Sequence, residues 1–247
     1  MRLLVDLRPC RPALGLALDE ALLDSMRVGG PETLRVWIND RSIILGRSQS
    51  VAAEVDEAAA ARHRFPILRR VSGGGTVVHY PGNLNVSVVV RERAEWAGVA
   101  QIFARFGGAL AVGMTAWGHP FRAVDNGIYA GTRKVGGAAQ ARRGNAILYH
   151  TTLMVRPCET PFDELLRALQ AGYEPATPAS RPRPVTSVSD VVGRAMKADD
   201  VAATAIEGLR RELGIDPHEG ALVPAEVAAA EALARDKYGR REWTTRH

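Results

Sequence analysis

The sequence predicts an α/β fold of the α+β type, in which helices flank a central mixed sheet that is largely antiparallel. Strand patterns between residues 121 and 155 follow one another through short turns instead of alternating regularly with helices. Amphipathic helical patterns lie towards both ends of the chain, at residues 13–27 and 199–213. With 46% hydrophobic residues among 247, the chain can bury a substantial core.

The first half of the chain predicts one long helix and then a series of short strands. The helix places its apolar residues at helical spacing and its acidic residues off that face: Leu14, Leu18, Leu22 and Met26 against Asp19, Glu20 and Asp24. The segments predicted after it are strands at 34–39 and 42–46, a helix at 55–62, and strands at 67–70, 76–80 and 84–90.

The second half begins with a predicted helix at 99–115, imperfect at Gly107-Gly108. The segments predicted after it are a strand and turn at 121–129, strands at 133–140 and 146–155, and helices at 162–171, 199–213 and 224–238. Ser189 and Asp190 are a predicted cap for the helix that follows them. Residues 174–186 form a proline-rich crossing segment and are the best candidate for a domain boundary. Because no internal repeat is visible, we expect residues 1–247 to form one domain.

The overall composition and charge of the chain exclude several classes of protein. The net charge of +5 suggests an anionic ligand or an acidic partner, but the basic residues are scattered, so no nucleic acid is expected. No run of eighteen apolar residues predicts a membrane span, and Asp6 interrupts any export signal. Two cysteines, Cys10 and Cys158, suit a reducing cytoplasm.

Residues 69–79 form the most informative stretch. Gly73, Gly74 and Gly75 cost backbone entropy and add nothing to a core, so they indicate close approach of the backbone to a ligand or an anion. Arg70 and Ser72 flank them. The alternative is a tight turn that needs glycine only for its backbone angles, but one or two glycines would suffice for that.

A second candidate group lies around Lys134. Gly136, Gly137 and Ala138 follow it closely, which leaves room for a ligand to lie along the strand beside a mobile positive charge. A solvated surface lysine is the alternative. The other candidates are His79 and His150 at the ends of apolar stretches, Asp125 and Asn126 in a turn, and Cys158, for which an inert thiol is the simpler interpretation.

Together these stretches resemble the lipoate–protein ligase family, within the biotin/lipoate ligase superfamily. The segments that carry the resemblance run in family order: Leu16-Ala17-Leu18-Asp19-Glu20, residues 34–49, residues 69–79 with Gly82-Asn83, residues 131–139, and His150-Thr151-Thr152-Leu153. The resemblance implies a biotin/lipoate ligase-like fold, related to class II synthetases. It also implies a two-step reaction that uses ATP, Mg²⁺ and lipoic or octanoic acid.

In that reaction the acid forms an acyl-adenylate, and a lysine of a lipoyl-domain protein then takes the acyl group. The resemblance implies that Lys134 stabilises the charge that develops in both steps. Arg70, Ser72 and the three glycines would orient the ligand, and Asp125 could ligate the metal. The remaining binding residues that it implies are Leu18, Trp37, Val77, His79, Asn126, Gly136, Gly137, Ala138, His150 and Thr151.

The chain also departs from the family pattern. Asp125-Asn126-Gly127 stands where the family often has Asn-Asp, and glycine stands where serine is common near Gly136. The chain stops where single-chain ligases continue into an accessory domain, so a separate small accessory subunit is a candidate partner. The alternative function is a cysteine-dependent octanoyl or lipoyl transferase, for which Cys158 matches poorly. A regulatory module that keeps the fold is a third reading.

Overall fold

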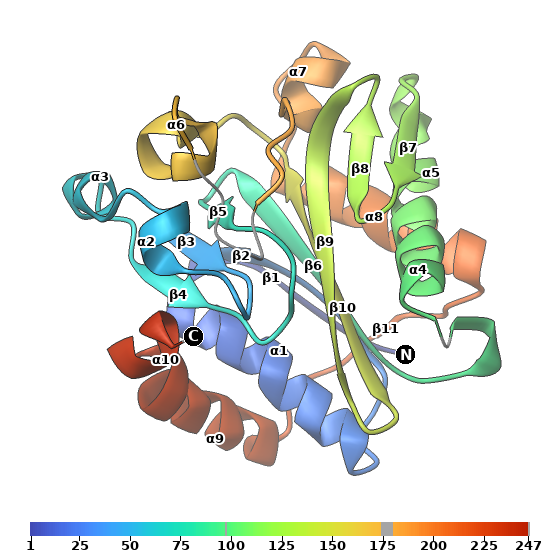
Figure 1. Cartoon of the computed structure of the whole chain (residues 1–247). Helices are drawn as coiled ribbons and strands as arrows, with labels where there is room; N and C mark the ends of the chain where they lie inside the picture. The colour runs from blue at the N-terminus through green and yellow to red at the C-terminus, as the bar shows by residue number, and fades with distance from the viewer. Residues whose placement is uncertain (97, 174–179, 247) are drawn as a thin grey trace.

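The computed structural model describes residues 1–96, 98–173 and 180–246. Its strands are β1 (Arg2–Cys10), β2 (Thr33–Asn39), β3 (Ser42–Leu45), β4 (Ile67–Arg69), β5 (Val77–His79), β6 (Asn83–Arg91), β7 (Phe121–Val124), β8 (Gly127–Ala130), β9 (Arg133–Arg143), β10 (Ala146–Met154) and β11 (His218–Glu219). Eight of them form one sheet in the order β11-β1-β2-β6-β10-β9-β8-β7, and β4-β3-β5 form another (Figure 1). The β11–β1, β1–β2 and β3–β4 pairs are parallel and the others antiparallel, which confirms the expected fold class.

The helices are α1 (Pro12–Arg27), α2 (Val51–Glu54), α3 (Glu57–Arg62), α4 (Val99–Ile102), α5 (Gly108–Met114), α6 (Phe162–Leu165), α7 (Val188–Val192), α8 (Ala198–Leu213), α9 (Pro224–Leu233) and α10 (Arg241–Thr245). A π-helical turn, Phe103–Gly107, joins α4 to α5, and another, Ala234–Tyr238, extends α9. Short 3₁₀ turns occupy Ala94–Trp96, Thr115–Trp117 and Arg167–Leu169.

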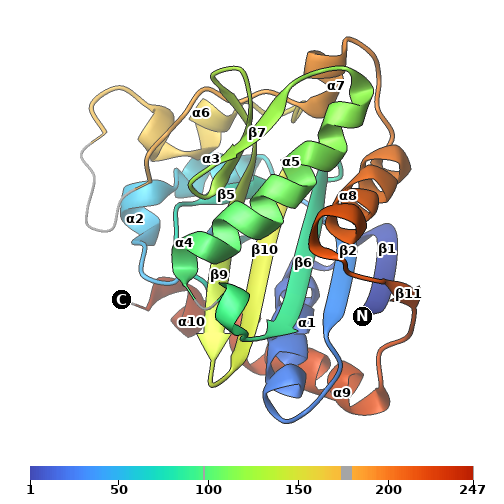
Figure 2. The same cartoon turned by 90° about the vertical axis from the view of Figure 1, so that its right-hand side faces the viewer.

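Helices cover both faces of the large sheet. The α4–α5 helix and α8 pack on one face, whereas α1, backed by α9, packs on the other (Figures 1 and 2). The first face holds the main core, in which Phe106 and Leu110 are buried against Val86 and Val88. The small sheet and the glycine loop, which is the name used below for residues 70–76 between β4 and β5, also lie at this second face, so a site can form between them and the large sheet.

Residues 99–117 have the length and hydropathy that a membrane span requires, although they contain no uninterrupted apolar run. In the structure, Ile102, Phe106, Leu110 and Met114 of this stretch are buried in the main core. The stretch therefore serves as a core helix of the large sheet.

Several predicted elements need correction. The helix expected at 55–62 begins two residues later, as α3, because Val55 bridges to Leu166 and Asp56 caps α3 by accepting a 2.8 Å bond from the Ala59 N–H. The short helix α2 before it was not predicted. Helix 162–171 is one short helix and a 3₁₀ turn. Strand β1 was not predicted, since Asp6, Arg8 and Pro9 interrupt its apolar pattern. Ser187, not Ser189, caps α7.

The proline-rich segment lies partly outside the described residues, at 174–179. Its described part, residues 180–186, is called the crossing segment below. It pairs with the start of β9: the Lys134 N–H donates to the Pro184 carbonyl at 2.8 Å, and the Thr186 N–H donates to the Lys134 carbonyl at 2.9 Å. The crossing segment therefore runs beside Lys134.

Candidate active site

A cavity of about 940 Å³ lies between the second face of the large sheet, the glycine loop and the crossing segment. Most residues that the sequence singled out meet in its wall: Trp37, Arg70, Gly74, Gly75, Val77, His79, Asp125, Asn126, Lys134, Gly136, Gly137, Ala138, His150 and Thr151. These positions come from β2, β5, β9 and β10, from the loop between β4 and β5, and from the turn between β7 and β8. The fold thus brings together stretches that are up to 114 residues apart in the chain, from Trp37 to Thr151.

Three of the predicted residues do not line the cavity: Leu18, Ser72 and Gly73. Leu16 and Leu18 both belong to the apolar cluster between α1 and α9, but only Leu16 also reaches the cavity wall. Two residues along a helix turn the side chain by about 200°. Leu16, and not Leu18, therefore stands at the wall position that the resemblance implied.

The glycine loop is shaped by Arg70, which is 6% exposed. Its guanidinium donates to the carbonyls of Gly73 and Gly75, at 2.6 and 2.8 Å, and to the Ser72 hydroxyl at 2.9 Å. Burial lowers the pKa of Arg70 to about 10, so it stays charged at neutral pH. The N–H groups of Arg70 therefore bind the loop and hold it in place, and they do not bind a ligand.

Gly74 is the position where the loop requires glycine. Its φ is +87°, a region that other residues rarely adopt. Its carbonyl also lies so close to Gly46 that a Cβ on Gly46 would stand 1.9 Å from it. Two glycines thus let the loop approach the end of β3 (Ser42–Leu45).

Lys134 reaches the cavity because β9 carries an irregularity. Gly137 pairs with Gly127 and Gly136 with Ile128, but Lys134 pairs with Tyr129, so Val135 is an extra residue on β9. Val135 is fully buried in the core, and Lys134 shares a face with Gly137. A Cβ on Gly137 would lie 3.2 Å from the Lys134 Nζ. The glycines beside Lys134 thus make room for the lysine itself.

The ammonium of Lys134 has no hydrogen-bond or ion-pair partner among the described residues. Burial, with a further contribution from the guanidinium of Arg183, lowers the pKa of Lys134. A half-buried cation without a partner is costly, and an anionic ligand would relieve that cost.

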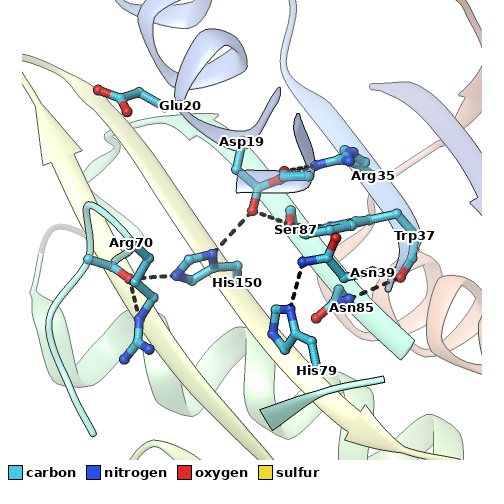
Figure 3. A network of polar contacts seen from close by, with 12 residues as sticks. Asp19, Glu20, Arg35, Trp37, Asn39, Arg70, His79, Asn85, Ser87 and His150 are labelled. Carbon is cyan, nitrogen blue, oxygen red and sulfur yellow. Dashed lines mark hydrogen bonds and ion pairs between the residues drawn. The ribbon is translucent and has the colours of Figure 1, made fainter. Parts of the chain in front are cut away.

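A network of polar contacts links α1 to the sheet and the glycine loop (Figure 3). Asp19, 2% exposed, binds the guanidinium of Arg35 at 2.6 Å, the hydroxyl of Ser87 at 2.8 Å and Nδ1 of His150 at 3.2 Å. His150 Nε2 in turn lies 2.6 Å from the Ser72 hydroxyl. These contacts lower the pKa of Asp19 against the opposing effect of burial.

The order Ser72–His150–Asp19 resembles the catalytic triad of serine hydrolases. However, Ser72 is 1% exposed, does not line the cavity, and already accepts a hydrogen bond from Arg70 Nε. A substrate in the cavity meets His150 but not the Ser72 hydroxyl. The network therefore orients His150 and holds the loop, and it does not provide a nucleophile.

His79 is a neutral imidazole in this site. Burial, aided by the nearby charge of Arg70, lowers the pKa of His79 to about 3. The Asn39 amide donates to His79 Nδ1 at 3.2 Å, which leaves the proton on Nε2. The edge of Trp37 meets the His79 ring with centroids 6.1 Å apart.

Sequence reasoning missed several polar residues of this region, above all Asp19, Arg35, Asn39 and Ser87. A usable signal was present, because polar residues recur with a period of two in otherwise apolar strands: Arg35 and Asn39 in β2, and Asn83, Asn85 and Ser87 in β6. Such a row marks a sheet face that does not belong to the apolar core. Asn83 Oδ1 is buried there without a partner among the described residues.

Neither cysteine lines the cavity. Cys10 donates to Asn39 Oδ1 at 3.4 Å, and Cys158 packs beside the small core under β3. Burial raises the pKa of both thiols. Both are therefore poor nucleophiles at neutral pH.

The described residues contain no cluster of His, Cys, Asp or Glu that could hold a metal by itself. Asp125 is exposed at the cavity edge with a φ of +50°. The amide of Asn126 donates to the Ala138 carbonyl at 3.1 Å. One carboxylate suits a Mg²⁺ ion held mainly by phosphates and water.

Comparison with known proteins agrees with this geometry. Residues 11–210 match the sequence profile of the lipoyl protein ligase A/B catalytic domain. The chain belongs to this family. Among lipoyl protein ligase A/B relatives, it is 29% identical to lipoate-protein ligase A subunit 1 of Thermoplasma acidophilum, over 98% of this chain and 95% of that protein. It is 31% identical to a protein named as lipoate-protein ligase A in Aeropyrum pernix, over 93% of this chain and 87% of that protein.

The family also contains transferases. The chain is 28% identical to the octanoyltransferase LipM of Symbiobacterium thermophilum, over 94% of this chain and 93% of that protein.

Solved structures of lipoyl protein ligases share the fold. A Thermoplasma acidophilum lipoate protein ligase with bound lipoic acid superposes with a TM-score of 0.85 at 29% identity, over 99% and 98% of the two chains. A lipoate-protein ligase A with bound ATP gives 0.83 at 29% identity, over 99% of each. A biotin protein ligase of Aquifex aeolicus, at 11% identity and a TM-score of 0.50, shares the fold over 87% of this chain and 70% of that chain.

Proposed function

We propose that the protein is an ATP-dependent lipoate–protein ligase. It activates lipoate or octanoate as an acyl-adenylate and transfers the acyl group to a specific lysine of a lipoyl domain. The observation that carries this proposal is Lys134, a half-buried ammonium without a protein partner in a cavity large enough for both substrates. Relatives named as lipoate-protein ligases support it.

The acyl chain would occupy the end of the cavity nearest α1. Leu16, Trp37 and Ile44 supply apolar surface there, and each is buried. The neutral His79 beside them adds no charge to this pocket. An apolar chain with a carboxylate at its outer end would thus point that carboxylate towards Lys134.

In the first step, a carboxylate oxygen attacks the α-phosphorus of ATP. The bond from that phosphorus to the bridging oxygen breaks, and pyrophosphate leaves with the electron pair. In the second step, the amine of the acceptor lysine attacks the acyl carbonyl, loses a proton, and AMP leaves. Lys134 would stabilise the negative charge that grows on the acyl and phosphate oxygens in both steps.

The rest of the rate enhancement would come from holding the two reactants in the correct positions. Arg70 holds the glycine loop in place, and His150 is oriented by Asp19, so the wall facing Lys134 is rigid before substrate arrives. Mg²⁺ would accompany the triphosphate and neutralise part of its charge. Asp125 is the residue that would hold it.

The alternative is acyl transfer from a carrier protein through a cysteine, as the name of the LipM relatives suggests. The position of both cysteines outside the cavity wall speaks against it. Such a transferase needs a thiolate within reach of the acyl carbonyl.

The proposed protein partners are a lipoyl-domain acceptor and a separate accessory subunit. The relative named as subunit 1 supports the second partner, because this chain covers 95% of it. The net charge of +5 suits an acidic acceptor. We also propose a cytoplasmic location, in keeping with two free thiols.

The test is lipoate-dependent exchange of pyrophosphate into ATP, run with and without the accessory protein. The proposal predicts exchange that Cys158→Ala and Cys10→Ala leave unchanged. Acyl transfer from acyl carrier protein without ATP, lost in Cys158→Ala, would contradict the ligase and establish the transferase.

A further inference from the structure

Two further cations stand in the cavity wall beside Lys134. Arg181 and Arg183 of the crossing segment both line the cavity and are exposed. Within the described part of the chain, neither guanidinium makes a hydrogen bond or ion pair. The neighbouring Arg133 differs, because its guanidinium donates to the Val185 carbonyl at 2.8 Å.

The crossing segment that carries these arginines is fixed on one side by Ser180. Its N–H donates to Glu54 Oε1 at 3.0 Å, and its hydroxyl also binds Glu54. The Thr76 N–H of the glycine loop and the Gln49 amide donate to the same hydroxyl, each at 3.0 Å. The segment is thereby tied to the loop and to α2.

On the other side the segment pairs with β9, through the Pro184 carbonyl and the Thr186 N–H. Pro182 and Pro184 restrict the backbone between the two anchors. Alternate residues of an extended backbone point the same way, which suits the placement of both Arg181 and Arg183 in one wall. The two guanidinium groups are thus presented from a held backbone.

No carboxylate of the described cavity wall neutralises these arginines. Glu54, 1% exposed, is occupied by Ser180, by the Tyr173 hydroxyl at 2.8 Å and by the Thr76 hydroxyl at 3.1 Å. Asp125 and Asp163 line the cavity without forming an ion pair to them. Burial lowers the pKa of Lys134, and the nearby positive charge of Arg183 lowers it further.

We propose that Arg181 and Arg183 bind the β- and γ-phosphates of ATP and stabilise pyrophosphate as it leaves. This inference rests on the proposed ligase function. When the bond from the α-phosphorus to its bridging oxygen breaks, the leaving group takes the electron pair and gains negative charge. Guanidinium groups match phosphate oxygens in pairs, and cations aimed at developing charge lower the barrier.

An acidic patch on the acceptor domain is the other ligand that two exposed arginines could bind. The two ligands act in different half-reactions, so they can be separated. Phosphate binding affects adenylate formation only, because a preformed acyl-adenylate has no β- or γ-phosphate. Acceptor binding affects transfer from that adenylate only.

The experiment compares Arg181→Ala, Arg183→Ala and the double variant with Arg194→Ala as a matched control. Arg194 is exposed and does not line the cavity. Three quantities are measured: pyrophosphate exchange with lipoate, transfer from synthetic lipoyl-adenylate to a lipoyl domain, and affinity for inorganic pyrophosphate by calorimetry. A thermal melt checks that each variant is folded.

We expect exchange in the double variant to fall by at least about tenfold, with a higher KM for ATP and a weaker pyrophosphate Kd. Transfer should stay at the wild-type rate, and Arg183→Lys should recover part of the exchange. Equal loss of both half-reactions, loss of transfer alone, or unchanged exchange would overturn the inference. A wild-type protein without exchange would instead contradict the ligase function itself.

Discussion

The polar groups at the two ends of the cavity differ in whether they have partners within the protein. At the inner end, Asp19, Arg35, Ser87 and His150 are buried or nearly so, and each binds another member of the network. At the mouth, Lys134, Arg181 and Arg183 carry positive charge with no partner among the described residues. The paired charges, Asp19 and Arg35, therefore lie behind the inner wall, whereas the unpaired charges line the mouth.

The difference shows which polar residues serve the fold and which serve a ligand. A buried charge that is already paired stabilises the structure as long as both partners remain. A cation at the mouth without a partner does not stabilise the fold, and its partial burial costs free energy, but it gives an incoming anion a favourable contact. We therefore expect changes at the inner end to alter stability first and changes at the mouth to alter activity alone.

The largest effect on stability is expected from Asp19→Asn, which removes the carboxylate that joins the polar network at the inner end. Loss of the carboxylate leaves the buried guanidinium of Arg35 unpaired, and the free energy of unfolding should fall by about 3–5 kcal/mol. Urea unfolding measures this directly. Asp24→Asn, on the same helix, is the control. Its half-exposed ion pair with Arg143 should contribute less than about 1 kcal/mol. Equal losses in the two variants would contradict the distinction.

A second effect on stability, which depends on pH, is expected from the protonation of His79, at the border between the two ends. Its folded pKa is about 3, whereas a free histidine titrates near 6.5. Between these values the unfolded chain binds a proton that the folded chain does not. The contribution of His79 to the free energy of unfolding is therefore fully present above pH 6.5. It falls as the pH drops towards 3, by up to about 1.4 kcal/mol per pH unit.

Urea unfolding at a series of pH values checks the sign and the window. His79→Gln, which keeps a neutral polar group, should remove most of the slope between pH 6 and pH 4. If the variant keeps the wild-type slope, other groups produce it and His79 is not held neutral.

The sequence was most informative where function leaves a local pattern. The three glycines, Lys134 and His150 stood out because their spacing is unusual for ordinary structure. Asp19 did not, because a carboxylate off the apolar stripe of a helix is normally in solvent. Its partners, Arg35 and Ser87, lie on two strands that meet α1 only in the folded chain.

Two other features depend on geometry that no local pattern contains. The extra residue Val135 turns Lys134 towards the cavity, and a strict alternation along β9 would have placed its side chain on the face where Ala138 packs in the main core. Leu18 fits the apolar repeat of α1 and Leu16 does not, yet the position of α1 against the sheet places Leu16 in the cavity wall. The strands other than β1 and β11, in contrast, followed from their apolar runs and turns.

The most direct test measures exchange and stability together in Lys134→Ala, with Lys237→Ala as the matched lysine. Lys237 binds the buried Glu20 at 2.7 Å and does not line the cavity, so its loss should lower stability and spare pyrophosphate exchange. Lys134→Ala should slow lipoate-dependent exchange by about 10²–10³-fold while the free energy of unfolding stays the same or rises. Exchange at the wild-type rate in Lys134→Ala, or a loss of stability like that of Asp19→Asn, would contradict the account.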